Sequence, residues 1–257
     1  MPNTVFAHVP YRRLRENLET LLSSGINPEI FFPAETLDNL IPEEATAIMD
    51  SLRNAGIRST IHAPFMDLNP GSFEPLLRQA TIHRFEQVLN VATIVQPDVI
   101  VMHPGYDRWR YGDRQTEWLE LALPVWRMVD ERAAAIGCHI AIENIFDEEP
   151  SVLKALIEAI DSPRVGHCFD VGHWNLFKNV SMADWFTELG ERIIHVHVHD
   201  NHGLHDDHLP LGDGMIDFGA YFHLMRRYAP NASYAIEAHD KNKVLLAHER
   251  LLQRLRV

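Results

Sequence analysis

The chain has 257 residues, 46% of them hydrophobic, and a formal net charge of −13 at pH 7. This length and composition are enough for a large core in one domain, residues 1–257, and no biased tract indicates disorder. The negative charge disfavours binding to a nucleic-acid backbone. No apolar run approaches membrane-spanning length, and no signal-like segment stands at the start, so we expect a soluble, cytoplasmic protein without membrane contacts.

Short β-rich runs alternate with helix-length segments along the chain. The predicted strands span residues 4–9, 29–32, 59–65, 99–105, 139–145, 165–170, 193–199 and 233–238, and the predicted helices span 11–24, 42–56, 75–95, 116–136, 150–160, 182–190, 218–228 and 244–255. Eight strand–helix repeats predict an α/β fold, a single (β/α)8 TIM barrel. A doubly wound open sheet is the alternative, but it usually has a glycine-rich turn after its first strand, and His8-Val-Pro-Tyr11 is not one.

Residues 193–217 concentrate histidine and aspartate. The segment contains His195, His197, His199, His202, His205 and His208, together with Asp200, Asp206 and Asp207. The alternation His-Val-His-Val-His places the histidines on one face of a strand. A histidine-rich surface loop is the alternative for any single residue. The cluster as a whole predicts a divalent metal site, because imidazole and carboxylate donors suit zinc, manganese and similar ions.

Polar residues recur where the predicted strands end, which is where TIM barrels place their catalytic groups. The strand ends supply His62, His103, Glu143, Asp170, His197 and Glu237, and the loops add His173, Asp206 and His208. A single carboxylate at such a place is often only a helix cap or an ion-pair partner. The joint placement predicts nine potential metal ligands at one end of the barrel, because buried charges are costly unless they are paired or bind a metal.

Several segments in this order resemble the xylose-isomerase-like TIM barrel superfamily. They are IHAPF at 61–65, MHPG at 102–105, IEN at 142–144, CFDVGH at 168–173, HVHD at 197–200, DDHLPLGDG at 206–214 and IE at 236–237. The superfamily contains sugar and sugar-phosphate isomerases and epimerases, hydroxypyruvate isomerase, inosose dehydratase and apurinic endonucleases of the endonuclease IV type. The resemblance covers nearly the whole chain. Its motifs are specific for the superfamily but indicate only weakly which reaction is catalysed.

The isomerase and epimerase branch implies one divalent metal, Zn, Mn, Mg or Co, held by Glu143, Asp170, His197 and Glu237. It also implies that Glu143 and Glu237 are the catalytic acid–base pair and that His173 touches the substrate. We therefore expect a metal-dependent isomerase or epimerase that acts on a small sugar, sugar phosphate or related hydroxy-carbonyl compound through an enediolate.

The endonuclease branch implies a phosphoesterase with up to three ions as the alternative function. The first ion would take His62, His103 and Glu143, the second the four ligands of the isomerase branch, and the third His173, Asp206 and His208. Two features disfavour this branch: residues 170–177, DVGHWNLF, lack the Asp-Thr-Cys-His sequence associated with it, and the chain is acidic.

The loop after the fourth predicted strand combines arginine and aromatic residues. Arg108 and Arg110 are expected to bind an anionic group of the substrate, and Trp174, next to the metal positions, to form a wall of the pocket. Trp109 and Tyr111 are interpreted either as part of a lid or as a dimer contact in a homo-oligomer.

Overall fold

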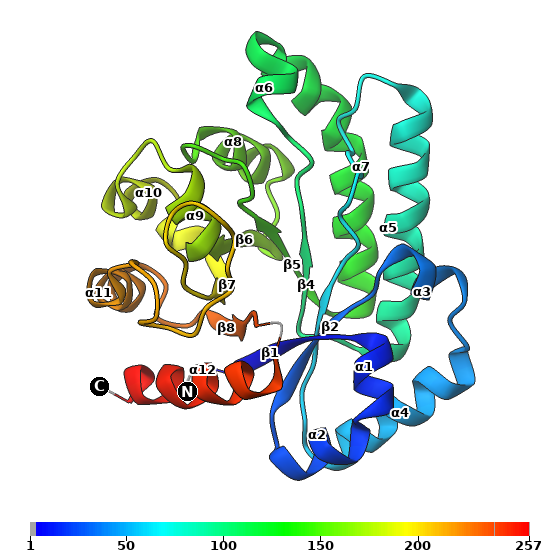
Figure 1. Cartoon of the computed structure of the whole chain (residues 1–257). Coiled ribbons are helices and arrows are strands. Elements are labelled where there is room, and N and C mark those ends of the chain that lie inside the picture. Colours follow the sequence, from blue (N-terminus) through cyan, green and yellow to red (C-terminus); the bar gives the residue numbers. More distant parts are fainter. Residues whose placement is uncertain (1–3, 239, 257) are drawn as a thin grey trace.

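The computed structural model describes residues 4–238 and 240–256 and confirms the predicted TIM barrel. Eight parallel strands pair in sequential order, and β1 closes the barrel against β8 (Figure 1). The strands are β1 (Val5–Pro10), β2 (Asn27–Phe31), β3 (Thr60–His62), β4 (Val99–Met102), β5 (His139–Glu143), β6 (Val165–Asp170), β7 (Ile193–Val198) and β8 (Ser233–Ile236).

Helices surround the strands, and the long α5 and α7 pack against each other on one side of the molecule (Figure 1). The helices are α1 (Tyr11–Glu16), α2 (Leu18–Ser24), α3 (Ala34–Asp38), α4 (Pro42–Asn54), α5 (Pro75–Val95), α6 (Arg108–Tyr111), α7 (Gln115–Ile136), α8 (Ser151–Ile160), α9 (Val171–Phe177), α10 (Met182–Leu189), α11 (Phe218–Tyr228) and α12 (Lys241–Leu255).

The structure corrects several predicted boundaries. The predicted helix 11–24 is divided at Asn17, whose backbone leaves the helical region (φ −123°, ψ 23°) and whose side-chain amide donates to the Arg13 carbonyl at 2.8 Å. The predicted strands 59–65 and 99–105 end earlier, at His62 and Met102. A proline follows two residues after each of these ends and has no N–H to donate to a sheet.

Side chains alternate between the outside and the inside of the barrel. Outward-facing residues pack with the helices in one large core, whereas Val99, Val101, Ala141 and Cys168 form a separate small apolar cluster. The small cluster is separate because it lies inside the barrel, where the strand backbones stand between it and the outer core. Inner positions are also occupied by polar side chains, and Glu29 is among those completely buried.

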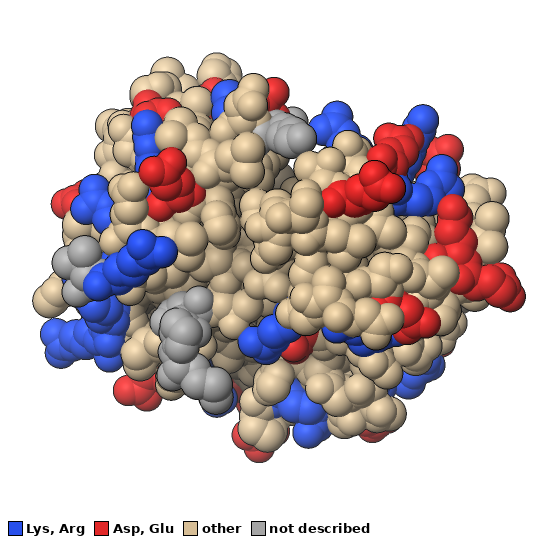
Figure 2. All heavy atoms as spheres, turned by 90° about the horizontal axis from the view of Figure 1, so that it is seen from below, with Lys and Arg blue, Asp and Glu red and all other residues tan. Residues whose placement is uncertain are grey.

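The surface is mixed in charge. Figure 2 shows acidic and basic side chains interspersed on the face that it presents. No helix within the described ranges is both long enough and apolar enough to cross a membrane.

Candidate metal centre

A cavity of about 960 Å³ opens where the strands end, and it contains most of the predicted site. Seven of the nine predicted ligands line it: His62, His103, Glu143, His173, Asp206, His208 and Glu237. The other two, Asp170 and His197, are completely buried beneath it. The fold therefore gathers all nine candidates in one region, as the strand-end argument predicted. That they bind metal stays a prediction.

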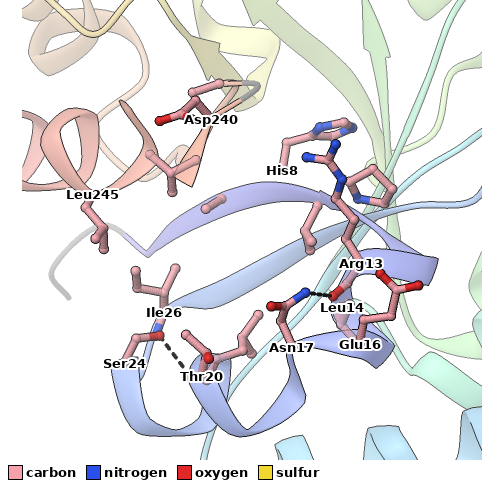
Figure 3. Close-up of a pocket in the computed structure, with 16 residues that line it drawn as sticks. His8, Arg13, Leu14, Glu16, Asn17, Thr20, Ser24, Ile26, Asp240 and Leu245 are labelled. Atoms are coloured by element: carbon pink, nitrogen blue, oxygen red, sulfur yellow. Dashed lines mark hydrogen bonds between the residues drawn. The ribbon is translucent and has the colours of Figure 1, made fainter. Parts of the chain in front are cut away.

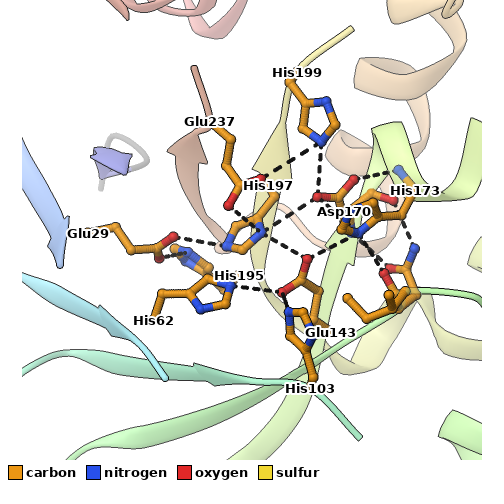
Figure 4. A network of polar contacts seen from close by, with 12 residues as sticks. Glu29, His62, His103, Glu143, Asp170, His173, His195, His197, His199 and Glu237 are labelled. Atoms are coloured by element: carbon orange, nitrogen blue, oxygen red, sulfur yellow. Dashed lines mark hydrogen bonds and ion pairs between the residues drawn. The ribbon is translucent and has the colours of Figure 1, made fainter. Parts of the chain in front are cut away.

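Three carboxylates surround one nitrogen of His197 at the floor of the cavity (Figure 4). Nδ1 of His197 lies 3.2 Å from Glu143 Oε1, 3.5 Å from Glu237 Oε1 and 3.6 Å from Asp170 Oδ2. Two ligands bound about 2.1 Å from one tetrahedral ion are about 3.4 Å apart. The three separations from His197 match that value, and the potential ligand atoms of Asp170, His197 and Glu237 all lie within 4.8 Å of one another, so these side chains form a candidate site for a divalent cation with Glu143 beside it.

A second group of contacts involves the other oxygen of Glu143. Glu143 Oε2 lies 3.3 Å from His62 Nε2 and 3.1 Å from His103 Nε2, and it makes no hydrogen bond of good geometry with any described residue. The Phe65 ring stacks on His103 with centroids 4.4 Å apart and so fixes the plane of that imidazole. This part of the pocket provides two more nitrogen donors beside the same carboxylate.

A third group lies nearer the cavity opening. Asp206 Oδ2 is 2.8 Å from His208 Nε2 and 3.4 Å from His173 Nε2. His208 Nδ1 is in turn 3.6 Å from Glu237 Oε2, which connects this group to the floor of the cavity.

His199 belongs to the site but was absent from the predicted ligands. Its ring is completely buried, its Nε2 lies 3.2 Å from Asp170 Oδ2, and it stacks on His208 with centroids 4.3 Å apart. Nδ1 of His199 has no hydrogen-bond partner among the described residues. The alternation of histidines at 195, 197 and 199 was the available sequence signal, although His199 lies just beyond the end of β7.

Two further polar residues contact the site from inside the barrel: Glu29, which was not predicted, and His195, which was named in the histidine cluster but not among the nine ligands. Both are completely buried, and together with His197 they form a group of potential ligands. Glu29 had no sequence signal, because a single acidic residue between Pro28 and Ile30 fits a solvent-exposed strand position equally well.

The buried carboxylates of the site need positive charge nearby to balance them. Burial raises the pKa of Glu143, but His197 and His103 outweigh it and hold that pKa well below the usual range. Burial lowers the pKa of His173, yet Asp170 and then Asp206 raise it well above the usual range. In a cation-free site, protonated imidazoles therefore balance the buried carboxylates, and a bound divalent ion would replace those protons.

The predicted substrate-binding residues lie in different places. Arg110 lines the cavity, whereas Arg108 is outside its described lining and forms an ion pair with Glu148 at 2.5 Å. Trp174 is buried outside that lining and carries the Lys178 ammonium group over its ring at 4.4 Å. Contact with the substrate stays a prediction for Arg108, Arg110 and Trp174. Only the prediction for Arg110 is supported by a position in the cavity lining.

A second cavity of about 580 Å³ lies between α1, α2 and α12 (Figure 3). It shares His8 and Pro10 with the first cavity. Its other described walls combine aliphatic side chains with polar ones, and none of the groups of potential metal ligands lies in it. The larger cavity is therefore the better candidate for a metal site.

Comparison with known proteins agrees with this arrangement. The xylose isomerase-like TIM barrel family matches residues 28–256. The chain belongs to this family. Among curated relatives, the uncharacterised protein MJ1311 of Methanocaldococcus jannaschii is 31% identical over 186 residues, which cover 70% of this chain and 64% of that protein.

Two solved structures of similar xylose isomerase-like barrels match nearly the whole chain. A D-tagatose 3-epimerase-like protein is 26% identical with a TM-score of 0.83, and the match covers 98% of this chain and 97% of that one. The TTHB071 protein of Thermus thermophilus, in a structure soaked with ZnCl2, is 27% identical with a TM-score of 0.79 and coverages of 99% and 98%.

Proposed function

We propose that this xylose isomerase-like barrel is a metal-dependent isomerase or epimerase of a small sugar, sugar phosphate or related hydroxy-carbonyl compound. The likeness to a D-tagatose 3-epimerase-like protein supports a sugar isomerase or epimerase activity. The observation that carries the proposal is the placement of Glu143 and Glu237 on either side of His197 (Figure 4).

Each of these glutamates directs its two oxygens to two different places. One oxygen of each lies beside His197 Nδ1, at 3.2 Å for Glu143 and 3.5 Å for Glu237. The other oxygens lie within 3.1–3.9 Å of paired histidines, His62 and His103 for Glu143, and His199 and His208 for Glu237. Each carboxylate can thus contribute one oxygen to a cation and keep the other for a proton.

A divalent ion held by Glu143, Asp170, His197 and Glu237 would polarise the oxygens of a hydroxy-carbonyl substrate and acidify the neighbouring C–H. One glutamate then removes that proton, becoming a carboxylic acid and leaving an enediolate. The opposite glutamate, protonated beforehand, delivers a proton to the carbon from the other face, which inverts its configuration. The paired histidines restore the starting protonation states by exchanging protons with the two glutamates.

Hydrogen exchange at the substrate carbon tests this proposal. Incubation with a panel of ketoses in deuterated water should place deuterium on the carbon next to the carbonyl. Glu143→Gln and Glu237→Gln should each abolish the exchange, whereas Glu117→Gln, an exposed glutamate paired with Arg114, should leave it unchanged. An active panel member that exchanges equally well with either site variant contradicts the assigned roles.

A multinuclear phosphoesterase is the second candidate, because donors beyond the central four converge in the same cavity. The additional donors are His62, His103, His173, Asp206 and His208. Metal analysis separates the two candidates: about one ion per chain favours the isomerase, and about three favour the phosphoesterase. Hydrolysis of phosphate esters or abasic DNA that depends on His62 and Asp206, without deuterium exchange, would replace the first proposal with the second.

A further inference from the structure

Glu29 is a charged residue in the barrel interior, away from the strand ends. It lies within β2, paired in register with Thr60 of β3, and its side chain is completely buried. Inner positions of TIM barrels are dominated by branched apolar residues. A buried carboxylate at such a position is costly unless several donors converge on it.

Three donors converge on Glu29. The Thr60 hydroxyl donates to Oε2 at 3.0 Å, and His195 Nε2 lies 2.9 Å from the same oxygen. His197 Nε2 lies 3.0 Å from Oε1 (Figure 4). Two of these contacts are hydrogen bonds, whereas Glu29 Oε1 and His197 Nε2 lie within hydrogen-bond distance but without good hydrogen-bond geometry.

The two nitrogens of His197 face two different partners. Nδ1 faces the carboxylates of Glu143, Asp170 and Glu237, whereas Nε2 faces Glu29. A metal-binding histidine usually donates its other ring N–H to a carboxylate or carbonyl, which fixes the tautomer and makes the ligand more basic. Glu29 stands where such an acceptor belongs.

We propose that Glu29 is a positioning residue that accepts the Nε2–H of His197 and so presents the Nδ1 lone pair to the metal. This inference rests on the proposed function, because it assigns Glu29 a role towards the same cation. Glu29 touches neither the reacting carbon nor the cation, and it acts only through the imidazole.

The contacts of His195 with Ser233 and Glu29 are consistent with this placement of the His197 proton. Ser233 Oγ lies 2.6 Å from His195 Nδ1. When the hydroxyl donates to Nδ1, the remaining proton of a neutral His195 is on Nε2 and points at Glu29. The two hydrogen bonds from Ser233 to His195 and from His195 to Glu29 then each have a donor and an acceptor, which leaves Glu29 Oε1 for His197.

Metal affinity of the stripped protein tests this role without relying on turnover. Zinc binding is measured by competition with a chromogenic chelator for the parent, Glu29→Gln, Thr60→Val and Glu117→Gln. Loss of the charged acceptor should weaken zinc binding by about 10- to 100-fold. Thr60→Val removes one donor to that carboxylate but keeps its charge, so it should lose less affinity than Glu29→Gln, and the exposed Glu117→Gln is the matched control that should bind zinc as the parent does.

The outcomes separate this inference from the proposed function. Equal losses of affinity in Glu29→Gln and Thr60→Val, or none in Glu29→Gln, overturn the positioning role while leaving the isomerase proposal standing. A parent protein that binds no divalent metal overturns both.

Nuclear magnetic resonance of the zinc-loaded parent tests the role even if Glu29→Gln does not fold. In protein with 15N-labelled histidine, His197 should carry its proton on Nε2, with a slowly exchanging signal, and have zinc on Nδ1. The signals are assigned by their loss in His197→Asn. A proton on Nδ1, or zinc on Nε2, overturns the proposal.

Discussion

The two oxygens of the Asp170 carboxylate have different roles, one in capping a helix and the other in the candidate metal site. Its Oδ1 accepts from the backbone N–H of His173 at 2.7 Å and caps α9, and its Oδ2 lies 3.2 Å from His199 and 3.6 Å from His197. Asparagine can provide the same cap but no charge. The two functions can therefore be separated by a single substitution.

We expect Asp170→Asn to lower the affinity for divalent metal by tenfold or more while the metal-free protein still unfolds in a single cooperative transition. The reason is that the variant loses an anionic ligand but keeps the helix cap. Equilibrium dialysis with metal analysis measures the first effect, and urea unfolding of metal-free protein measures the second. Full metal occupancy in the variant would remove Asp170 from the ligand set.

Gly172 makes space for His199. A Cβ atom at residue 172 would overlap the His199 imidazole, although the residue lies in α9, where alanine is intrinsically favoured by up to about 1 kcal/mol. We expect Gly172→Ala to destabilise the metal-free parent by about 1–3 kcal/mol, because a closely packed side chain must move.

The same substitution in a His199→Ala background should be neutral or stabilising, since the obstructing ring is gone. Urea unfolding of the four proteins in this double-mutant cycle gives the coupling free energy between the two positions. Identical effects of Gly172→Ala in both backgrounds would show that the ring does not occupy that space.

The sequence alone could bring the nine candidate ligands to one region, because six stand at the ends of recognisable strands and three lie in the loops that follow two of those strands. That they bind metal stays a prediction. His199, Glu29 and His195 could not be assigned in the same way. The position of His199 depends on the turn after β7. The burial of Glu29 depends on which face of its strand the closed barrel turns inward. Such contacts join residues as far apart as 29 and 195, and their spacing along the chain does not encode them.

At the scale of elements, a helix was predictable where its ends carry strong signals. The prediction for α5 matches both ends, with Pro75 in the first turn. In contrast, α9 was missed because it follows β6 without a loop, and its N-cap Asp170 is also the last residue of the predicted strand. The predicted strands 59–65 and 99–105 were too long, because a proline lies two residues past the observed end of each.

His167 connects β6 to α10 through two hydrogen bonds. Its Nδ1–H donates to the Ile142 carbonyl at 2.9 Å, and its Nε2 accepts from the Trp185 indole N–H at 3.2 Å. Trp185 can only donate, so the imidazole must be neutral. Burial lowers the pKa of His167 to about 4, against the opposing effect of the Ile142 carbonyl.

We expect this histidine to contribute to acid unfolding. The unfolded chain takes up a proton near pH 6.5 and the folded protein only near pH 4, so stability is lost as the pH falls through this window, by at most about 3 kcal/mol. His167→Gln, which can form both hydrogen bonds, should lose correspondingly less stability between pH 7 and pH 4. Urea unfolding across that range measures the difference, and parallel profiles would contradict it.

At the scale of the whole molecule, the proposed centre joins four consecutive strands, which make up half of the barrel. The four central ligands come from β5, β6 and β7 and from the residue directly after β8. Glu143 and Glu237 are three strands apart in the closed ring, which allows them to approach the site from different sides. A bound cation would therefore hold together segments that are distant in sequence.

Removal of metal should consequently destabilise the entire barrel. A ligand present at 100 times its Kd stabilises the folded state by about 2.7 kcal/mol, which for a chain of this size corresponds to a shift in Tm of about 5–10 °C. We expect a chelator to lower the Tm by that amount and added metal to restore it. Asp170→Asn, with an affinity at least tenfold lower, should show about half of this response or less at the same metal concentration.

The size of this shift should also depend on pH. Imidazole and carboxylate ligands bind metal only in their deprotonated forms, so protons compete with the metal, and affinity falls as the pH is lowered from 7.5 towards 5.5. The difference in Tm between metal-loaded and chelator-treated protein should shrink over the same interval. A constant difference would exclude histidine from the ligands, and no difference at any pH would mean that the buried carboxylates are balanced by protonated histidines alone.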